Sequence, residues 1–560
     1  MTPCFILLAL ALTASTSPAV EKKCTTSCET LTQSAAVVDA QKASVRQVLS
    51  DSPETPRFGK EVRALYQSVD DRLVWTHGGR ATEQTAAVTE ALRSADQKGL
   101  VASDYDGANW ADRLSQIDRE GSSTAALARF DVALSEAAIH YVADLGGGRI
   151  NPNLEHFETD RSAHRQDVVA HVVQLADAPD IAQQLTLIEP SFPAYQRDLQ
   201  ALQTYLALVP SDDGEKLAPL TRSVLPGDAY VGVAQLARRL RLFGDLSASA
   251  IVGTAYDAAI VLAVVHFQLR HGLPTDGVLD KATVRELNVP LARRITQLQL
   301  ALERLRWLPR EFASPPLIIN IPEFRLHGDD TALKWVLSMK VVVRRAYRHQ
   351  TPVFVADMRE VIFRPDWNVP RDIESKELIP ELEKNPQRLA AQDFDLVDRN
   401  GVPHALAAND ETVQQLRAGE LRFRQKPGAS NALGLIKFVF PNSHDIYLHS
   451  TPTPLLFQKS RRDFSHGCIR VEEPDLLAAW VLQQNPEWTL DRIRAAMNGP
   501  TQITVKLAQA IPVLILYSTA VVMEDGDVHF FDDIYGHDKT LERSLTRRES
   551  PRQLAGSFLP

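Results

Sequence analysis

The segment Phe464–Val471 reads FSHGCIRV, and the segment Ile446–Thr451 before it reads IYLHST. Both alternate polar and apolar residues, which is the pattern of β-strands that bury one face. Extended strands would turn Leu448, Ile469 and Val471 toward a core. The polar side chains then lie on the opposite faces of the two segments: Tyr447 and His449 from the first, and His466, Cys468 and Arg470 from the second.

Cys468 is the cysteine that the rest of the chain leaves unpaired. Of the four cysteines, Cys4 falls in an apolar N-terminal run, while Cys24 and Cys28 are close enough to bridge in an oxidising compartment. A free thiol with a pKa of about 8.5 is only a few per cent thiolate at neutral pH, and an imidazole beside it can remove the proton. Either histidine of the two segments could take that role.

Gly467 and Arg470 flank the thiol in ways that suit nucleophilic chemistry. Glycine allows a backbone conformation that other residues resist, which would let the Cys468 amide point at a developing oxyanion. Arg470 supplies a fixed positive charge for a substrate carboxylate. Two other interpretations stay open: an inert buried thiol, or a zinc ion shared by Cys468, His449 and His466. Because a fourth zinc ligand is not evident, no metal is predicted.

The chain changes character on either side of these strands. β-Branched and aromatic runs such as LIINIPEF and WVLSMKVVVRR predict a mainly β domain, and apolar residues at helical spacing predict helices before it. Within the β domain, Ile373–Leu389 is a Lys/Glu-rich helical insertion. The predicted order is a signal peptide at 1–19, a linker at 20–50, a helical domain at 51–225, a small helical module at 226–290, a linker helix at 291–314, the β domain at 315–538 and a flexible tail at 539–560.

The N-terminus, MTPCFILLALALTASTSPAVEKKC, resembles a secretory signal. Its apolar run Phe5–Leu12 is too short to cross a bilayer, and cleavage is expected near Ala14 or Ala19. The missing Lys/Arg region keeps an uncleaved anchor or a wrongly assigned start as alternatives. Glu-Lys-Lys before Cys24 argues against lipidation there. We expect export to the periplasm or cell envelope, with no further membrane span.

Charge and composition exclude several other classes. A formal net charge of -9 over 560 residues, with no basic block, argues against a DNA or RNA partner. His266 and His271 lack companions at metal-ligand spacing and are interpreted as surface or capping residues. The glycines of Gly146–Gly148 follow a helical pattern and predict a helix-terminating loop instead of a phosphate site. No metal or cofactor is expected.

The string from His449 through a Pro-rich loop to SHGCIR resembles the signature of the L,D-transpeptidases, whose catalytic domain is YkuD-like. Further blocks resemble the same domain: TPVF at Thr351–Phe354, RPDWNVP at Arg364–Pro370 and KPGASNALGLIKFVFPN at Lys426–Asn442. The FQxxHGLxxDG punctuation at Phe267–Gly277 resembles the peptidoglycan-binding domain 1 family. The order of scaffold, module and catalytic domain resembles the large Gram-negative L,D-transpeptidases over nearly the full chain.

The resemblance implies roles for individual residues. The catalytic group comprises Cys468 as nucleophile, His449 as general base, and the amides of Gly467 and Cys468 with Tyr447 around the oxyanion. The supporting and substrate-binding group comprises Ser465, His466, Arg470, Trp367 and Asn368. For Trp367 and Asn368, a core residue and a turn residue are equally good interpretations. Related long enzymes often carry Asp after the catalytic His, where this chain has Ser450.

The same resemblance implies a reaction on peptidoglycan. The Cys468 thiolate would attack the carbonyl of diaminopimelate, the third residue of a tetrapeptide stem, releasing D-alanine and leaving a thioester. The side-chain amine of a neighbouring stem would resolve it into a 3-3 crosslink without a cofactor. Stem peptides and glycan are the implied partners, and carbapenems would acylate the same thiol. Three alternatives remain: transfer to water, transfer to a lipoprotein lysine, and a peptidoglycan-binding protein without catalysis.

Overall fold

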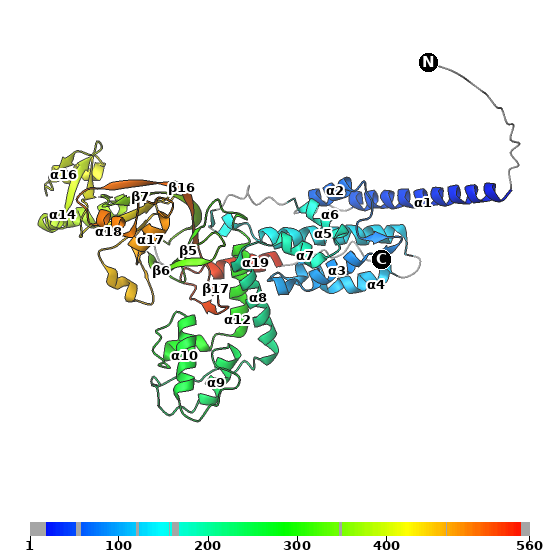
Figure 1. Cartoon of the computed structure of the whole chain (residues 1–560), viewed down its shortest axis with the longest axis horizontal. Helices are drawn as coiled ribbons and strands as arrows, with labels where there is room; N and C mark the ends of the chain where they lie inside the picture. Colours follow the sequence, from blue (N-terminus) through cyan, green and yellow to red (C-terminus); the bar gives the residue numbers. More distant parts are fainter. Residues whose placement is uncertain are drawn as a thin grey trace, which may run out of the picture. The chain divides into compact units, whose positions relative to one another are not determined.

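The chain divides into two compact units in the computed structural model (Figure 1). The first unit comprises Met1–Asp96, Val101–Asp144 and Asp167–Ile188, and the second comprises Gln97–Leu100, Leu145–Gln166 and Glu189–Pro560. The structure describes residues 18–51, 58–118, 122–155, 157–158, 167–345, 350–465 and 467–549, with side chains from residue 35 and to residue 547.

The structure describes only part of the N-terminal region for which the sequence makes predictions. Residues 1–17 of the expected signal lie outside the described part of the chain, as do the side chains of Cys24 and Cys28. The segment predicted as a linker is helical, because α1 runs over Pro18–Asp51. Among the described residues, none of the helices is long and apolar enough to cross a membrane.

The first unit is helical, as expected. Its buried centre is organised by Asp131, whose carboxylate accepts the backbone N–H groups of Val74 and Trp75, both at 2.8 Å, and the Tyr66 hydroxyl at 2.7 Å. Burial raises the pKa of Asp131 to about 6. The helices are α2 (Gly59–Ser68), α3 (Glu83–Arg93), α4 (Trp110–Ile117), α5 (Thr124–Gly147, which reaches into the second unit), α6 (Val168–Asp177) and α7 (Ile181–Ile188).

The glycine run Gly146–Gly148 lies at the end of α5, as predicted. Gly148 has a φ of 81°, and a Cβ there would lie 2.7 Å from Trp307 Nε1. Only glycine fits this approach, because other residues rarely adopt a positive φ and their Cβ would collide with the indole. The run therefore serves packing within the second unit.

The small module consists of α9 (Val233–Leu242), α10 (Ala258–Arg270) and α11 (Lys281–Leu287). The buried Gln268 gives a structural reason for the FQxxHGLxxDG motif. Its side-chain amide donates to the Val278 carbonyl at 3.0 Å and accepts the Gly277 N–H at 2.9 Å. His271 does stand at the C-cap of α10, but it is buried, so its interpretation as a surface residue is wrong. His266 is half-exposed between Asp245 and Asp527.

The C-terminal domain is built on one large mixed sheet, which confirms the mainly β prediction. The neighbours follow the order β12-β13-β15-β6-β5-β4-β16-β7-β3, and β12 also pairs with β7. The bounds are β3 (Phe157–Glu158), β4 (Leu317–Asn320), β5 (Arg325–Asp329), β6 (Trp335–Arg344), β7 (Val353–Phe363), β12 (Ile436–Val439), β13 (Leu448–His449), β15 (Ile469–Val471) and β16 (Ile503–Leu516). β14 (Asp463–Ser465) pairs with β6 off this path.

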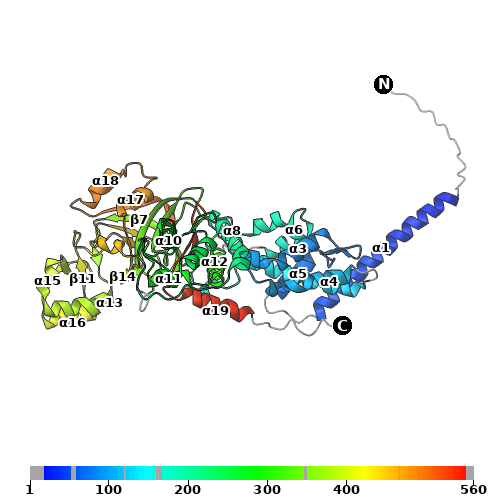
Figure 2. The same cartoon turned by 90° about the horizontal axis from the view of Figure 1, so that it is seen from below.

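The predicted helical insertion is part of a larger lobe with its own sheet and core (Figures 1 and 2). Its sheet has the order β10-β9-β11-β8, and Val369, Leu382, Leu396, Leu416 and Phe423 fill its core. The elements are β8 (Trp367–Asn368), α13 (Arg371–Ile373), a π-helical turn (Glu374–Leu378), α14 (Ile379–Lys384), α15 (Pro386–Ala391), β9 (Phe394–Asp398), β10 (Pro403–His404), α16 (Asp410–Ala418) and β11 (Leu421–Gln425).

Several further elements complete the second unit. The expected linker helix is α12, and the expected Asp-Gly turn joins β17 to β18. Their bounds are α8 (Pro193–Leu208), α12 (Leu291–Leu305), α17 (Pro474–Val481), α18 (Leu490–Met497), β17 (Ala520–Val522), β18 (Val528–Phe530) and α19 (His537–Glu549).

The prediction of a flexible tail from residue 539 is wrong as far as Glu549, where the chain forms α19. Leu541 is buried in the core of the second unit. Arg293 on α12 pairs with Glu542 at 2.7 Å, and Arg304 pairs with Asp538 at 2.6 Å. The charges that suggested a solvated tail are partners of α12 instead.

Candidate active site

The two segments that carry the polar motif are adjacent parallel strands. Leu448 of β13 pairs with Ile469 of β15, and the Ile469 N–H donates to the Tyr447 carbonyl at 3.2 Å. Leu448, Ile469 and Val471 are buried in the main core, as the alternation predicts. The opposite face therefore presents the polar residues of both strands together.

The side chain of Tyr447 forms a hydrogen bond with the Cys468 thiol. The thiol is half-buried, and its Sγ lies 3.7 Å from the Asp445 carbonyl oxygen. Burial raises the pKa of Cys468, while hydrogen bonds from Tyr447 and the positive charges of Arg344 and Lys437 act against that rise. Lys437 Nζ lies 3.8 Å from the centre of the Tyr447 ring. Burial is the larger effect on the thiol, and these neighbours offset part of it.

His449 lies beside this cluster as a buried neutral imidazole. Its ring centre is 5.9 Å from that of Tyr447, and its Nδ1 lies 2.6 Å from the Ser450 carbonyl. Burial, aided by the charge of Arg470, lowers the pKa of His449 to about 3. Since Nδ1–H donates to a carbonyl, Nε2 is left as the basic nitrogen. Within the described residues, the imidazole and the thiol make no hydrogen bond to each other.

Ser450 fixes the strand that holds His449. Its hydroxyl accepts the Leu435 N–H at 2.6 Å and donates to the Leu433 carbonyl at 3.2 Å. Gly434 has a φ of 65°, and a Cβ there would lie 2.1 Å from Ser450 Oγ. The block NALGLI therefore wraps around the residue after His449.

Two side chains hold the loop that carries Cys468: Ser465, which belongs to the same segment, and Arg344, which lies at the end of β6. The Ser465 hydroxyl donates to the Cys468 carbonyl at 2.5 Å and accepts the Gly467 N–H at 3.2 Å. Ser465 is 4% exposed, so it supports the loop and offers no open surface to a substrate. Arg344 Nε donates to the Gly467 carbonyl. Sequence reasoning missed Arg344, which lies 123 residues before Gly467 in a strand whose sequence has no distinguishing feature.

The conformational argument for Gly467 is wrong in this structure. Its φ lies outside the left-handed region, and a Cβ built on it would meet nothing within 4 Å. A Cβ on Gly467 would therefore point into open space. Its N–H is already used by Ser465, whereas the Cys468 N–H has no acceptor among the described residues.

The remaining predicted residues fall into three positions. Arg470 is half-buried with its Nε unpaired and its Nη1 3.5 Å from Thr453 Oγ1. Trp367 packs against Phe394 of the insertion lobe and also hydrogen-bonds toward Tyr447, which lowers the Tyr447 pKa against the larger effect of burial. Asn368 is exposed at the start of that lobe. His466 lies outside the described residues.

The three further sequence blocks meet around this site. Asn431 is fully buried, and its Nδ2 donates to the carbonyls of Pro365 and Lys426, both at 3.0 Å. Thr351 Oγ1 accepts the Arg344 N–H at 3.1 Å. The Asn431 contacts join the two blocks on either side of the insertion lobe, and the Thr351 contact supports Arg344, which binds the Gly467 carbonyl. Among the described residues, no cluster of three His, Cys, Asp or Glu side chains is arranged for a metal.

Comparison with protein families assigns the three regions. Residues 316–504 match the model described as "L,D-transpeptidase catalytic domain" (YkuD), residues 230–287 match "Putative peptidoglycan binding domain", and residues 60–202 match "Scaffold domain". Residues 316–504 are an L,D-transpeptidase catalytic domain. The resemblance drawn from the SHGCIR string and its companion blocks is thereby confirmed, and so is the fold class of the chain.

The proteins similar to this chain include one matched by sequence and one among solved structures. A protein of Haemophilus influenzae described as "Putative L,D-transpeptidase" is 32% identical over 253 residues, which cover 44% of this chain and 49% of that protein. The chain thus spans about half the length of this curated relative. A crystal structure of the L,D-transpeptidase from Xylanimonas cellulosilytica is 13% identical and covers 54% of this chain and 100% of that one, with a TM-score of 0.15.

Proposed function

We propose that this chain is a cysteine L,D-transpeptidase that forms 3-3 crosslinks between peptidoglycan stems. The observation that supports this most is the position of Cys468 in the catalytic domain, half-buried between Tyr447 and two cationic side chains, with a neutral imidazole on the next strand. A thiol in such surroundings is a nucleophile for a carbonyl carbon. The domain match supports the substrate class.

The first half of the proposed reaction acylates the enzyme. The Cys468 proton passes to Nε2 of His449, and the thiolate attacks the carbonyl carbon of diaminopimelate at the third position of a tetrapeptide stem. The bond from that carbon to the nitrogen of D-alanine then breaks, and the departing amine takes the proton from His449. A thioester to Cys468 remains. A small rotation of the thiol from Tyr447 toward His449 must precede the proton transfer, because resting hydrogen bonds in such sites often tighten only with substrate.

The second half returns the thiol. The side-chain amine of a neighbouring stem attacks the thioester and gives its proton to His449, and the carbon–sulfur bond breaks as the new amide forms. Cys468 leaves as the thiolate and is protonated again. Since the energy of the broken peptide bond is kept in the thioester, no nucleotide or cofactor is required.

Other groups of the site support individual steps. The Cys468 N–H and the Tyr447 hydroxyl are the donors proposed for the oxyanion, while Gly467 leaves room for the substrate. We propose that Arg470 binds a substrate carboxylate with its unpaired Nε, and that Trp367 and Asn368 line the donor side of the cleft. Ser465 shapes the loop. For His466 we propose the supporting or substrate-binding role that the family resemblance implies.

The cellular setting follows from the same proposal. Peptidoglycan stems and glycan are the proposed partners, supported by the match of residues 230–287 to a peptidoglycan-binding model. Action on that polymer supports the periplasm or cell envelope as the location, with the N-terminal segment as the proposed export signal. Acylation of Cys468 by carbapenems is a further consequence, because they present a strained carbonyl to the same nucleophile.

One experiment separates the proposed reaction from its alternatives. Wild-type protein and the Cys468→Ala variant are incubated with disaccharide-tetrapeptide, and both protein and products are followed by mass spectrometry. A thioester adduct, released D-alanine and a 3-3 dimer, all absent in the variant, are the expected result. Tripeptide without dimer would point to water or a protein lysine as acceptor, and an unchanged substrate in both samples would favour a binding protein without catalysis.

A further inference from the structure

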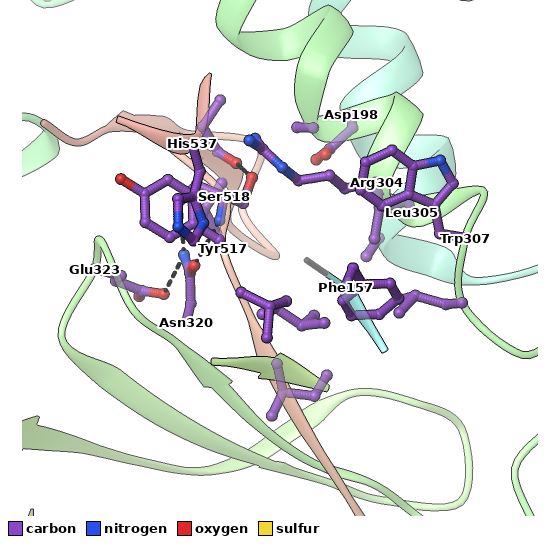
Figure 3. Close-up of a pocket in the computed structure, with 18 of the residues that line it drawn as sticks. Phe157, Asp198, Arg304, Leu305, Trp307, Asn320, Glu323, Tyr517, Ser518 and His537 are labelled. Carbon is purple, nitrogen blue, oxygen red and sulfur yellow. Dashed lines mark hydrogen bonds between the residues drawn. The ribbon is translucent and has the colours of Figure 1, made fainter. Parts of the chain in front are cut away.

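A cavity of about 310 Å³ lies in the second unit, apart from the loop of Cys468 (Figure 3). It is enclosed by α8, α12, α19, the β3–β7 edge and the segment after β16, and neither Cys468 nor His449 lines it. Cavities that hold small ligands have about 300–1,000 Å³ and mostly apolar walls with a few polar groups. The size of this cavity falls in that range.

Aromatic and aliphatic side chains form most of the wall. Figure 3 shows Phe157, Leu305 and Trp307 grouped on one side of the space. Ile318 and Leu516, from the paired strands β4 and β16, also line the cavity. Such a surface would bind an apolar body by removing it from water, at about 25 cal/mol for each Å² covered.

Several of the charged side chains around the cavity have polar partners in the second unit. Arg304 donates to Asp538 at 2.6 Å, Glu323 lies 3.0 Å from His327 Nε2, and Arg197 Nε donates to the Val522 carbonyl at 3.3 Å. The charged and titratable residues of the lining are Glu155, Arg197, Asp198, Arg304, Glu323, His327, Tyr517, Tyr535 and His537.

Asp198 and Glu323 are the buried acids of the lining, and of the two it is Glu323 that lies beside a histidine. Asp198 is 5% exposed on α8, and Figure 3 shows it at the cavity next to Arg304. No ion pair reaches its carboxylate among the residues that the structure describes. Burial raises the pKa of Asp198 to about 8, although the charge of Arg197 and a backbone hydrogen bond from Val522 act in the opposite direction. A buried acid without a cation costs stability that an apolar residue would not cost.

We propose that this cavity binds a small ligand with an apolar body and one ammonium group, which pairs with Asp198. The ammonium would stabilise the ionised form of Asp198, and the apolar body would cover Phe157, Leu305 and Trp307. A volume of 310 Å³ equals that of about ten water molecules, so the body is no larger than roughly one ring with a short chain. The proposal does not depend on the reaction at Cys468.

The test uses three probes that share a ring and differ in charge: benzylamine, benzyl alcohol and benzoate. Their binding to the full-length protein is measured at pH 7 by isothermal titration calorimetry. We expect benzylamine to bind at least tenfold more tightly than benzyl alcohol, and benzoate not to bind. Asp198→Asn should reduce the affinity for benzylamine to that for benzyl alcohol. Ala194→Leu should weaken the binding of both by filling the cavity. Asp491→Asn, which changes an exposed acid elsewhere, should leave the affinity for every probe unchanged.

Proton release gives a second measurement on the unaltered protein. Asp198 is mostly protonated at pH 7 before binding and ionised beside an ammonium, so benzylamine binding should release about one proton. Calorimetry in two buffers of different ionisation enthalpy measures that number, and it remains available if Asp198→Asn does not fold. Equal binding of the three probes, no binding at millimolar concentration, or binding without proton release would each overturn the proposal.

Discussion

Ser450 shows at the scale of a single residue how one hydroxyl can hold a loop. Its hydroxyl satisfies the backbone of the loop that wraps around His449. An aspartate could accept the same N–H groups, but it could not donate to the Leu433 carbonyl. A serine instead of an aspartate here is therefore a change in hydrogen-bond direction at one atom.

Removing this hydroxyl should cost both stability and activity. We expect Ser450→Ala to lower the unfolding free energy by about 1–3 kcal/mol, because it leaves the Leu435 N–H buried and unpaired. Acylation should slow as well, since the imidazole loses its support. Urea denaturation and the rate of D-alanine release measure the two effects. Ser443→Ala, at an exposed serine in a neighbouring loop, is the control, and equal values for both variants would refute the role.

Gly467 offers a second test at this scale. Because a Cβ there meets nothing within 4 Å and φ is unstrained, Gly467→Ala should change stability by less than about 0.5 kcal/mol. The added methyl group would stand where the substrate approaches, so we expect acylation to slow by about tenfold to a hundredfold. Gly428→Ala, in another loop of the domain, is the matched control. A variant that acylates at the wild-type rate would show that the open side is not the route of approach.

At the scale of elements, β6 contributes more to the site than its sequence indicates. Arg344 at its end holds the Gly467 carbonyl, and its own carbonyl accepts the Tyr535 hydroxyl at 2.6 Å. Its positive charge also lowers the pKa of Cys468 against the effect of burial. One side chain thus positions the loop and favours the thiolate.

The neighbouring residue provides a matched control for this role. We expect Arg344→Gln to raise the pKa of the Cys468 thiol and to slow its alkylation by iodoacetamide at pH 7 by roughly threefold to tenfold. Rates should converge at high pH, where the thiol is ionised in both proteins. Arg345→Gln, whose side chain is exposed, should follow the wild-type profile. Mass spectrometry of the Cys468 peptide distinguishes this thiol from the other cysteines. If Arg344→Gln and the wild-type protein are alkylated at the same rate at every pH, Arg344 has a purely structural role.

The sequence predicted the elements better than the contacts between them. Alternation around Cys468 and His449 was sufficient to place two strands and their buried faces, because period-two burial is a local property. Arg344 and Asn431 act across long separations, and no local pattern marks such partners. The conformational reason given for Gly467 failed because glycine in a motif can mark open space as well as a positive φ. The helix α19 was missed because its charges pair with α12, which composition alone does not reveal.

At the scale of the whole second unit, the small module is joined to the C-terminal segment by buried polar contacts. Arg270 donates to the Val528 carbonyl at 2.5 Å, and His271 stacks between Phe267 and Phe530. His271 Nδ1 also lies 3.1 Å from Glu286. A buried histidine at this junction couples the stability of the unit to pH.

The sign of that coupling follows from the direction of the pKa shift. Burial lowers the pKa of His271 from 6.5 to about 3, so the folded state keeps a neutral imidazole where the unfolded chain is protonated. The contribution to stability is complete above pH 6.5 and is lost as the pH falls toward 3. Glu286, with a pKa lowered to about 2, adds a loss in the same direction only below pH 4.5.

We therefore expect the wild-type unfolding free energy to fall more steeply between pH 7 and pH 5 than that of His271→Gln. The difference in slope should be about 1 kcal/mol per pH unit below pH 6.5, because one proton is bound on unfolding in the wild type only. The variant should be less stable at pH 7, where it lacks the ring stacked on Phe267 and Phe530. Urea titrations at pH 7, 6 and 5 measure both quantities. Parallel slopes would mean that His271 is protonated in the folded unit and that the junction is open to water.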